Sequence, residues 1–181
     1  MTSVIKVDNI QNSSGTAALS IDSSGRVTMA NTVEIDIWRL NANWTTASAD
    51  ITSGWERSDD ATSGYAGTGM TESSGYFTFP SSGLWKLTGC FFISIASGDT
   101  SAGVLVSVST DSGSTWQATS GGFESQSINT SLAFQTLINV TNASTFRVKF
   151  TSNSLASGTY IVGNTNRDYT TLIFERITDS Q

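Results

Sequence analysis

Acidic residues are the side chains in this sequence that could do acid–base chemistry. Cleavage of a glycosidic bond needs two carboxyl groups that flank it, and one of them must have a raised pKa. The sequence places its candidates in polar, turn-rich segments, where nothing indicates a raised pKa. These candidates are Asp59, Asp60, Asp99, Asp111, Glu124 and Asp168. The residues therefore predict no catalytic pair, and a polysaccharide depolymerase remains only an alternative.

Metal and cofactor chemistry has little support in the residue types. Asp59-Asp60 could offer oxygen ligands to calcium, but no EF-hand-like spacing surrounds them and a solvated loop explains them as well. The chain has no histidine and one cysteine, Cys90, so a zinc site or an activated thiol lacks its usual partners. Cys90 stands in an apolar run and is expected to be a buried small side chain. We expect no cofactor and no metal.

The segment Ser109–Trp116 has the spacing of a structural turn. Asp111 could accept hydrogen bonds from turn amides, Gly113 could take a positive φ, and Trp116 could pack beneath the hairpin. The segment resembles the Asp-box of sialidases, which is a structural hairpin in that family. It occurs once here, and the arginines are too dispersed for a sialidase site. We interpret it as a hairpin.

Composition excludes several classes of function. Only 13% of the 181 residues are charged, the net charge is −6, and the basic residues are scattered singly. Neither a nucleic-acid binder nor a protein attracted to an anionic membrane is expected, because both need a basic surface. Apolar runs are too short to span a bilayer and no signal peptide is visible, so we expect assembly in a host cytoplasm.

Alternating apolar residues predict strands from Val33 onward. Residues 146–150 and 169–177 alternate clearly, and about eight to ten such runs are separated by turn signals. Between 33 and 44 the apolar parity flips at Trp38, which suggests a bulge or a strand that changes partner. Residues 45–75 form a long polar connection, anchored by Trp55, Tyr65 and Met70. The fold class is predicted to be all-β, an antiparallel jelly-roll sandwich.

Residues 1–32 differ from the knob domain predicted at 33–181. They contain no aromatic residue and carry two similar phrases, 10–15 and 21–25, each a short strand that enters a glycine turn. So short a segment cannot bury much alone, so it either attaches to a larger particle or intertwines with its own copies; a flexible tail is the alternative. The apolar residues expected to act here are Val4, Ile5, Val7 and Ile10.

The segment Gly75–Leu87 resembles a known signature. It is similar to the Gly-x-Phe-x-x-Pro-x-x-Gly-x-Tyr-x-Phe pattern of the complement globular-head and tumour-necrosis-factor-like superfamily, with Trp85 and Leu87 in place of tyrosine and phenylalanine. In this interpretation Phe77 and Trp85 fill the core from two antiparallel strands, and Pro80 and Gly83 shape the turn between them. The resemblance spans about 33–177 and implies a homotrimeric knob.

The N-terminal phrases resemble the opening of virion structural proteins of marine tailed phages, including cyanophages, which often join such a segment to a jelly-roll knob. This resemblance implies a non-enzymatic virion surface protein that docks on other capsid or tail proteins. A short fibre or receptor-binding tip and a capsid decoration or head fibre both fit. A lectin-like module that binds a host surface glycan is the other alternative.

Two sets of residues follow for these functions. The closing strand at 169–177 is expected to approach a three-fold axis, with Tyr169, Leu172 and Phe174 as the candidates. Aromatic residues near turn-rich segments could stack on a ligand, although core packing is the alternative for each. These are Trp44, Trp55, Tyr65 and Tyr160.

Overall fold

The computed structural model describes the chain except for residues 1–6, 12, 16, 30–32, 62 and 125–128. Every regular element in the described part is a β-strand, as the alternating sequence predicts. No stretch of the described chain forms a helix with the length and apolar character needed to cross a bilayer. The chain divides into two compact units, Met1–Val33 and Glu34–Gln181.

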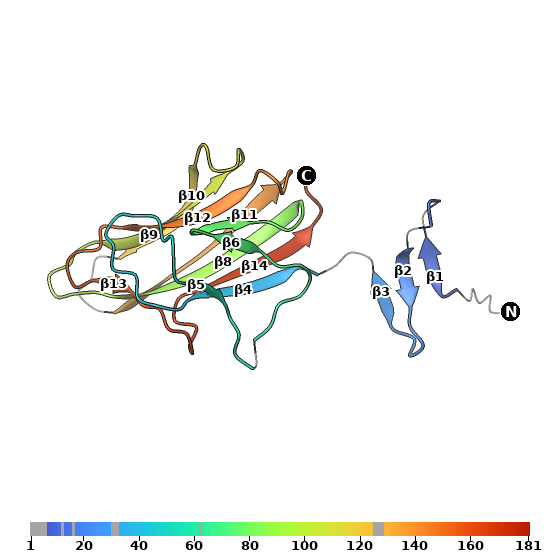
Figure 1. Cartoon of the computed structure of the whole chain (residues 1–181), viewed down its shortest axis with the longest axis horizontal. Coiled ribbons are helices and arrows are strands. Elements are labelled where there is room, and N and C mark those ends of the chain that lie inside the picture. Colours follow the sequence, from blue (N-terminus) through green and yellow to red (C-terminus); the bar gives the residue numbers. More distant parts are fainter. Residues whose placement is uncertain (1–6, 12, 16, 30–32, 62, 125–128) are drawn as a thin grey trace. The chain divides into compact units, whose positions relative to one another are not determined.

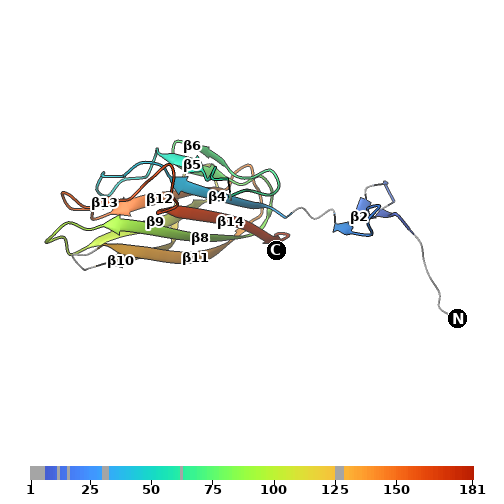
Figure 2. The same ribbon diagram turned by 90° about the horizontal axis from the view of Figure 1, so that it is seen from below.

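The second unit is an antiparallel sandwich of two sheets (Figures 1 and 2). One sheet has the order β10-β9-β12-β7-β6, and the other has the order β11-β8-β14-β4-β5, with β13 paired to β8. The strands of the first sheet are β6 (Thr71–Ser73), β7 (Tyr76–Thr78), β9 (Ala102–Ser109), β10 (Gln117–Glu124) and β12 (Arg147–Asn153). Those of the second are β4 (Ile35–Leu40), β5 (Trp55–Arg57), β8 (Gly83–Ser94), β11 (Thr130–Val140), β13 (Tyr160–Ile161) and β14 (Thr171–Thr178). In both sheets several neighbours are distant in sequence, such as β12 beside β7 and β14 beside β4, which is typical of a jelly roll.

A cluster of aromatic rings fills the space between the sheets. Phe77 is fully buried at its centre, with ring centroids 5.4 Å from Trp38, 5.5 Å from Trp55, 5.7 Å from Phe150 and 5.3 Å from Phe174. Offset and edge-to-face pairs at these separations are favourable beyond the area that they bury. The cluster joins strands of both sheets, so it fixes how the sheets stack.

The Gly75–Leu87 segment crosses from one sheet to the other. Phe77 and Trp85 are both core residues, as expected, but β7 pairs with β6 and β12 while β8 pairs with β11 and β14. They are therefore not partners in one hairpin, which corrects the sequence interpretation. Gly75 serves the preceding two-residue turn, where Ser74 and Gly75 both have positive φ, the geometry of a type I′ hairpin.

Strand β4 contains no bulge, contrary to the prediction made from its parity flip. Its register with β14 is uninterrupted from Ile35 to Arg39. Trp38 and Leu40 point into the core, whereas Ile35 and Ile37 are half-buried on the outer face. The parity flips because both faces of this strand carry apolar side chains.

The 45–75 connection contains two short strands and is anchored to β4. Asp36 pairs with Arg57 at 2.8 Å and accepts a hydrogen bond from the Met70 amide at 2.6 Å. Trp55 and Met70 are buried, as expected of anchors. Tyr65 remains 55% exposed and holds its place beneath the Arg57 guanidinium, 4.6 Å from the ring centroid.

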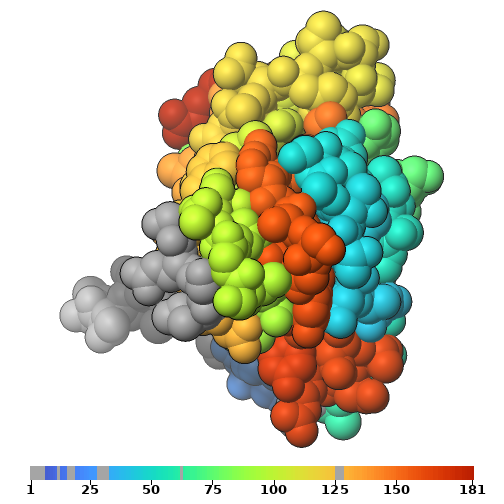
Figure 3. Space-filling view, turned by 90° about the vertical axis from the view of Figure 1, so that its left-hand side faces the viewer, coloured from blue at the N-terminus to red at the C-terminus, as the bar shows by residue number. Residues whose placement is uncertain are grey.

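Loops from distant parts of the chain form one end of the knob, shown in Figure 3. The Asp99 carboxylate accepts hydrogen bonds from the Thr159 hydroxyl and from the Ala156 and Ser101 amides. The Thr159 hydroxyl bond and these amides outweigh burial, so they lower the pKa of Asp99 below its usual value of 3.8. The loops at 95–101 and 154–160 are therefore tied together by an ionised group.

The first unit is a three-stranded antiparallel sheet of β1 (Asn9–Gln11), β2 (Ala17–Ile21) and β3 (Val27–Met29), in the order β1-β2-β3. Gly15 and Gly25 take positive φ at its two turns, as the repeated phrases predict. The Asp22 carboxylate accepts hydrogen bonds from the Ser24 and Arg26 amides and so shapes the second turn.

Candidate functional site

The outer face of the β11-β8-β14-β4 sheet is a regular surface built from four paired strands. Register places its outward residues in rows across the four strands, for example Gln135, Thr88, Ile173 and Ile37. We call this surface the assembly face. Its members are Ser131, Ala133, Gln135, Leu137, Thr88, Cys90, Phe92, Tyr169, Thr171, Ile173 and Ile37.

The assembly face is weakly charged and partly apolar. Lys86 and Glu175 border it as an ion pair with 3.0 Å between Nζ and the carboxylate. At the opposite end Phe92 and Tyr169 stand side by side, with ring centroids 5.9 Å apart. Leu137 is 59% exposed. A sheet face of this kind, with small, uncharged and apolar side chains, is suited to contact with another protein surface.

A buried arginine lies beside the assembly face. The Arg39 side chain is fully buried and projects from the outer side of β4. Its guanidinium is 2.8 Å from Glu56 and 3.1 Å from Asp60, and it also pairs with Asp59 and with Asp168 at 3.4 Å. Arg39 therefore joins β4 to the loops on both sides of it.

The Arg39 cluster shifts the pKa of two of its members, Arg39 and Glu56, toward their charged forms. Burial alone would lower the pKa of Arg39, but hydrogen bonds to Glu56 and Asp168 outweigh it and raise that pKa. Burial alone would raise the pKa of Glu56, but the Arg39 and Asn41 hydrogen bonds outweigh it and lower that pKa. A general acid needs the opposite shift. Asp59 and Asp60, which the sequence offers either as calcium ligands or as a solvated loop, both pair with the guanidinium, and no group of three or more metal-binding side chains occurs among the described residues.

The Ser109–Trp116 segment is the predicted hairpin turn between β9 and β10. The Asp111 carboxylate accepts hydrogen bonds from the Thr115 amide at 2.8 Å and the Thr115 hydroxyl at 2.7 Å, and Gly113 has a φ of +92°. The two Thr115 bonds and one from the Ser109 hydroxyl lower the pKa of Asp111 to about 2. The Asp111 carboxylate is therefore a hydrogen-bond acceptor within its own turn, and it is not among the partners of Arg39.

Trp116 lies next to this hairpin, on the outer face of the β10-β9-β12-β7-β6 sheet. Its ring centroid is 5.2 Å from that of Tyr76, and the Lys149 ammonium lies 4.6 Å from its ring centroid. Lys149 also pairs with Asp50 at 2.9 Å. The result is a half-exposed aromatic pair next to polar groups, a combination that can stack on a sugar ring. The sequence did single out Trp116, but as a packing residue only.

The candidate axis residues point in two directions. Leu172 and Phe174 are fully buried between the sheets, so they face away from any partner, and the structure corrects this part of the prediction. Tyr169 is 39% exposed and belongs to the assembly face. The side chains that β14 turns outward are Thr171 and Ile173. Strand alternation in the sequence indicated two faces, but not which face meets the core.

The four candidate ligand-facing aromatics do not form one site. Trp55 lies in the core, which rules it out as a ligand contact. Trp44 is half-buried, and its indole donates to the Thr46 carbonyl and the Ser152 hydroxyl, both at 3.1 Å. Tyr160 is half-buried in β13, and Tyr65 is exposed beside Arg57. Of the candidate attachment residues, Val7 and Ile10 are exposed, whereas Val4 and Ile5 lie outside the described residues.

Two sequence patterns belong to the assembly face, although the sequence analysis explains them in other ways. The parity flip in β4 and the run of Cys90, Phe91 and Phe92 both place apolar side chains on two faces of one strand. Phe91 fills the core, and Cys90 is half-buried on the outer face instead of being a core residue. Strands that are buried on both faces read as near-continuous apolar runs, and this is the pattern that the two segments share.

The fold is shared with solved structures. No family model matches the sequence, and no curated protein matches it. A crystal structure of murine APRIL at pH 8.5 superposes with a TM-score of 0.59 and 9% sequence identity, covering 80% of this chain and 99% of that one. The structure of Eiger TNF from S. frugiperda gives a TM-score of 0.60 with 8% identity, covering 83% of this chain and 96% of that one. The knob therefore has a tumour-necrosis-factor-like jelly-roll fold.

Proposed function

We propose that this chain is a non-enzymatic surface protein of a bacteriophage virion and that it forms a homotrimer through the assembly face. The observation that carries the proposal is the weakly charged, partly apolar outer face of the β11-β8-β14-β4 sheet on a jelly roll of this type. The sequence signature at Gly75–Leu87 supports the trimer. The phage-like N-terminal phrases support the virion, either as a short fibre or receptor-binding tip or as a capsid decoration or head fibre.

The edge of the same sheet also favours self-association. Strand β11 has eleven residues and, among the described strands, pairs only with β8. A long edge strand with exposed apolar side chains such as Leu137 invites pairing with other chains unless something covers it. A closed ring of three copies would place this edge against the next copy's assembly face and leave no copy uncovered.

Two matched substitutions test the trimer. Gln135→Arg places a charged side chain in the middle of the assembly face, and Gln117→Arg makes the same change on an exposed residue of β10 in the other sheet. We expect the wild type and Gln117→Arg to have a solution mass three times the chain's 19.2 kDa, and Gln135→Arg to dissociate on dilution. Equal masses for the two variants, or a wild-type monomer, would count against the proposal.

The virion assignment has its own test. Antibody raised against the purified knob should label intact phage particles in electron micrographs, on the tail tip or on the capsid. Label confined to host-cell debris would contradict it. The same purified protein should release no products from host polysaccharides, since a depolymerase would do so.

A second candidate function is glycan binding by the knob. The half-exposed pair of Trp116 and Tyr76, with the Lys149–Asp50 ion pair beside it, favours this over a purely structural role. Retention on an array of host surface polysaccharides, lost in Trp116→Ala and kept in Trp44→Ala, would support it. Absence of retention on every polysaccharide would leave a scaffold role.

A further inference from the structure

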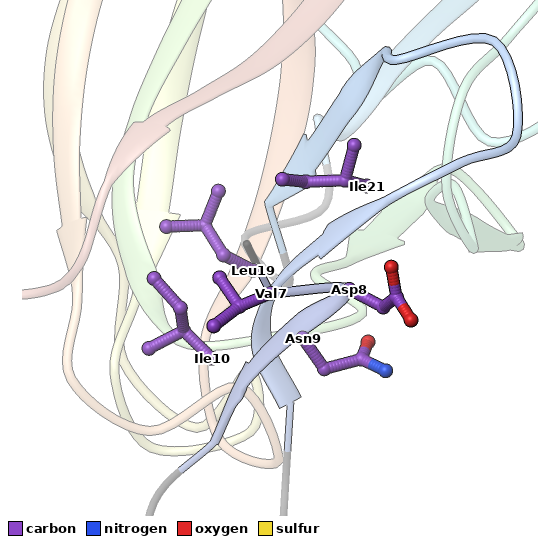
Figure 4. Close-up of a pocket in the computed structure, with 6 residues that line it drawn as sticks. All are labelled: Val7, Asp8, Asn9, Ile10, Leu19 and Ile21. Carbon is purple, nitrogen blue, oxygen red and sulfur yellow. The ribbon is translucent and has the colours of Figure 1, made fainter. Parts of the chain in front are cut away.

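The N-terminal sheet has one apolar face that no described residue of its own unit covers. Ile10 stands opposite Leu19 in the register of β1 and β2, and Ile21 stands opposite Val27 in that of β2 and β3. Because Leu19 and Ile21 are two residues apart on β2, all four share a face. Ile10, Ile21 and Val27 are 53%, 41% and 59% exposed. Figure 4 shows Val7, Ile10 and Leu19 gathered at one shallow pocket on this sheet, with the Asp8 carboxylate pointing away from them.

The opposite face is polar, so the exposure follows a pattern. Asn9 stands opposite Ser20, and both alternate with the apolar residues of the same strands. A sheet that is apolar on one face and polar on the other is built to pack its apolar face on something. A unit of 33 residues is too small to supply a second layer from its own chain.

The charges of the unit fit packing against its own copies. The first 33 residues contain Lys6, Asp8, Asp22 and Arg26, a net charge of zero, whereas the remaining residues carry the whole net charge of −6. Asp22 and Arg26 also neutralise each other at 2.8 Å within their turn. Copies of this sheet would therefore approach one another without like-charge repulsion. The unit has no excess charge that would favour a basic or an acidic partner.

The free strand edges of the sheet also favour association with other copies of this chain. Among the described residues β1 and β3 pair only with β2, so each unit offers two free strand edges. An isolated sheet with free edges on both sides is marginally stable and prone to pair with further strands. Three copies tethered to one trimeric knob would meet at a high effective concentration, since each is joined to a subunit of the same assembly.

We propose that the apolar face of the N-terminal sheet, formed by Ile10, Leu19, Ile21 and Val27, packs against the same face of two other copies of this chain around the three-fold axis. The inference rests on the homotrimer of the proposed function and adds a second contact to it. The N-terminal units would then form a stalk in which three sheets bury their apolar faces together and turn their polar faces to water.

A pair of labelled full-length chains tests this packing. In a Cys90→Ser background, Ile10→Cys places a thiol on the apolar face and Asn9→Cys places one on the adjacent polar face, and each is labelled with pyrene maleimide. We expect strong excimer emission from the label at position 10 and at least about fivefold less from that at position 9, because pyrene excimers require rings in contact. Val27→Glu added to the Ile10→Cys chain should abolish the excimer while the mass stays trimeric.

The outcomes separate the two proposals. A trimeric mass with no excimer at position 10, or with equal excimers at positions 9 and 10, would overturn the packing of the N-terminal sheets and leave the trimeric knob intact. A particle protein would then be the remaining occupant of the apolar face. A monomeric mass for the wild type would overturn the proposed trimer itself. A trimeric mass with an excimer at position 10 alone, lost in Val27→Glu, supports both.

Discussion

Replacing Arg39 by methionine should destabilise the knob strongly, because the guanidinium is fully buried between carboxylates. Methionine keeps much of the side-chain volume but leaves Glu56, Asp60 and their neighbours without their cation. Bonds to a charged partner contribute about 1.5–3 kcal/mol each when buried. Here the carboxylates are from 25% to 79% exposed, so solvent screens most of that energy. We expect a loss of about 3 kcal/mol, or roughly 6–12 °C in Tm for a unit of this size.

The assay is urea denaturation of wild type, Arg39→Met and Arg167→Met at one chain concentration, since association shifts apparent stability. Arg167 is exposed and its side chain makes one long hydrogen bond, of 3.5 Å, to the Tyr169 hydroxyl among the described residues, so its loss should cost less than about 0.5 kcal/mol. Arg39 holds the pKa of Glu56 below its usual value of 4.5, so the stabilisation is complete above that pH and is lost as the pH falls below it. The deficit of Arg39→Met should therefore shrink from pH 7 to pH 4. Equal stabilities of the two variants, or a deficit that grows on acidification, would refute the reasoning.

Three further changes have defined outcomes. Gly75→Ala should destabilise the knob by at least about 2 kcal/mol in urea denaturation, because a Cβ there would lie 2.3 Å from the Ile51 carbonyl oxygen. Gly98→Ala is the control: its φ is similar, +88°, but a Cβ there would meet open space, so it should cost only about 1 kcal/mol. Equal costs for the two variants would contradict this prediction. Asp111 should contribute fully to the stability of its turn above pH 3.8 and lose this contribution as the pH falls through about 2. The protection of the Thr115 amide, its exchange rate relative to an unstructured amide at the same pH, should therefore fall only in that window. A loss of protection already near pH 5 would be inconsistent with this role. Cys90, the single thiol, should react with a maleimide several-fold more slowly in the trimer than in Gln135→Arg, and identical rates would argue against burial of the assembly face in the trimer.

Several features of the fold followed from local sequence. Strand alternation at 146–150 and 169–177 is set by the pleat, which sends successive side chains to opposite faces regardless of context. The turns at Gly15, Gly25 and Ser109–Trp116 depend on residues a few positions apart, and their chemistry can be read directly. These local rules gave the all-β class and the hairpin around Asp111.

The pairing of strands, and with it the candidate site, was decided by tertiary structure. The pleat alone cannot determine which face of β14 meets the core. Leu172 and Phe174 are therefore candidates for the three-fold axis in the sequence, but in the structure they face the core. The carboxylates of Asp59, Asp60 and Asp168 were unrelated in sequence until β4 brought Arg39 between them, because ion pairs across 20 to 129 residues depend on the whole chain path. Sequence determined which segments are strands and turns; only the stacking of two sheets, driven by burial of aromatic rings from both, decided which side chains became core and which became surface.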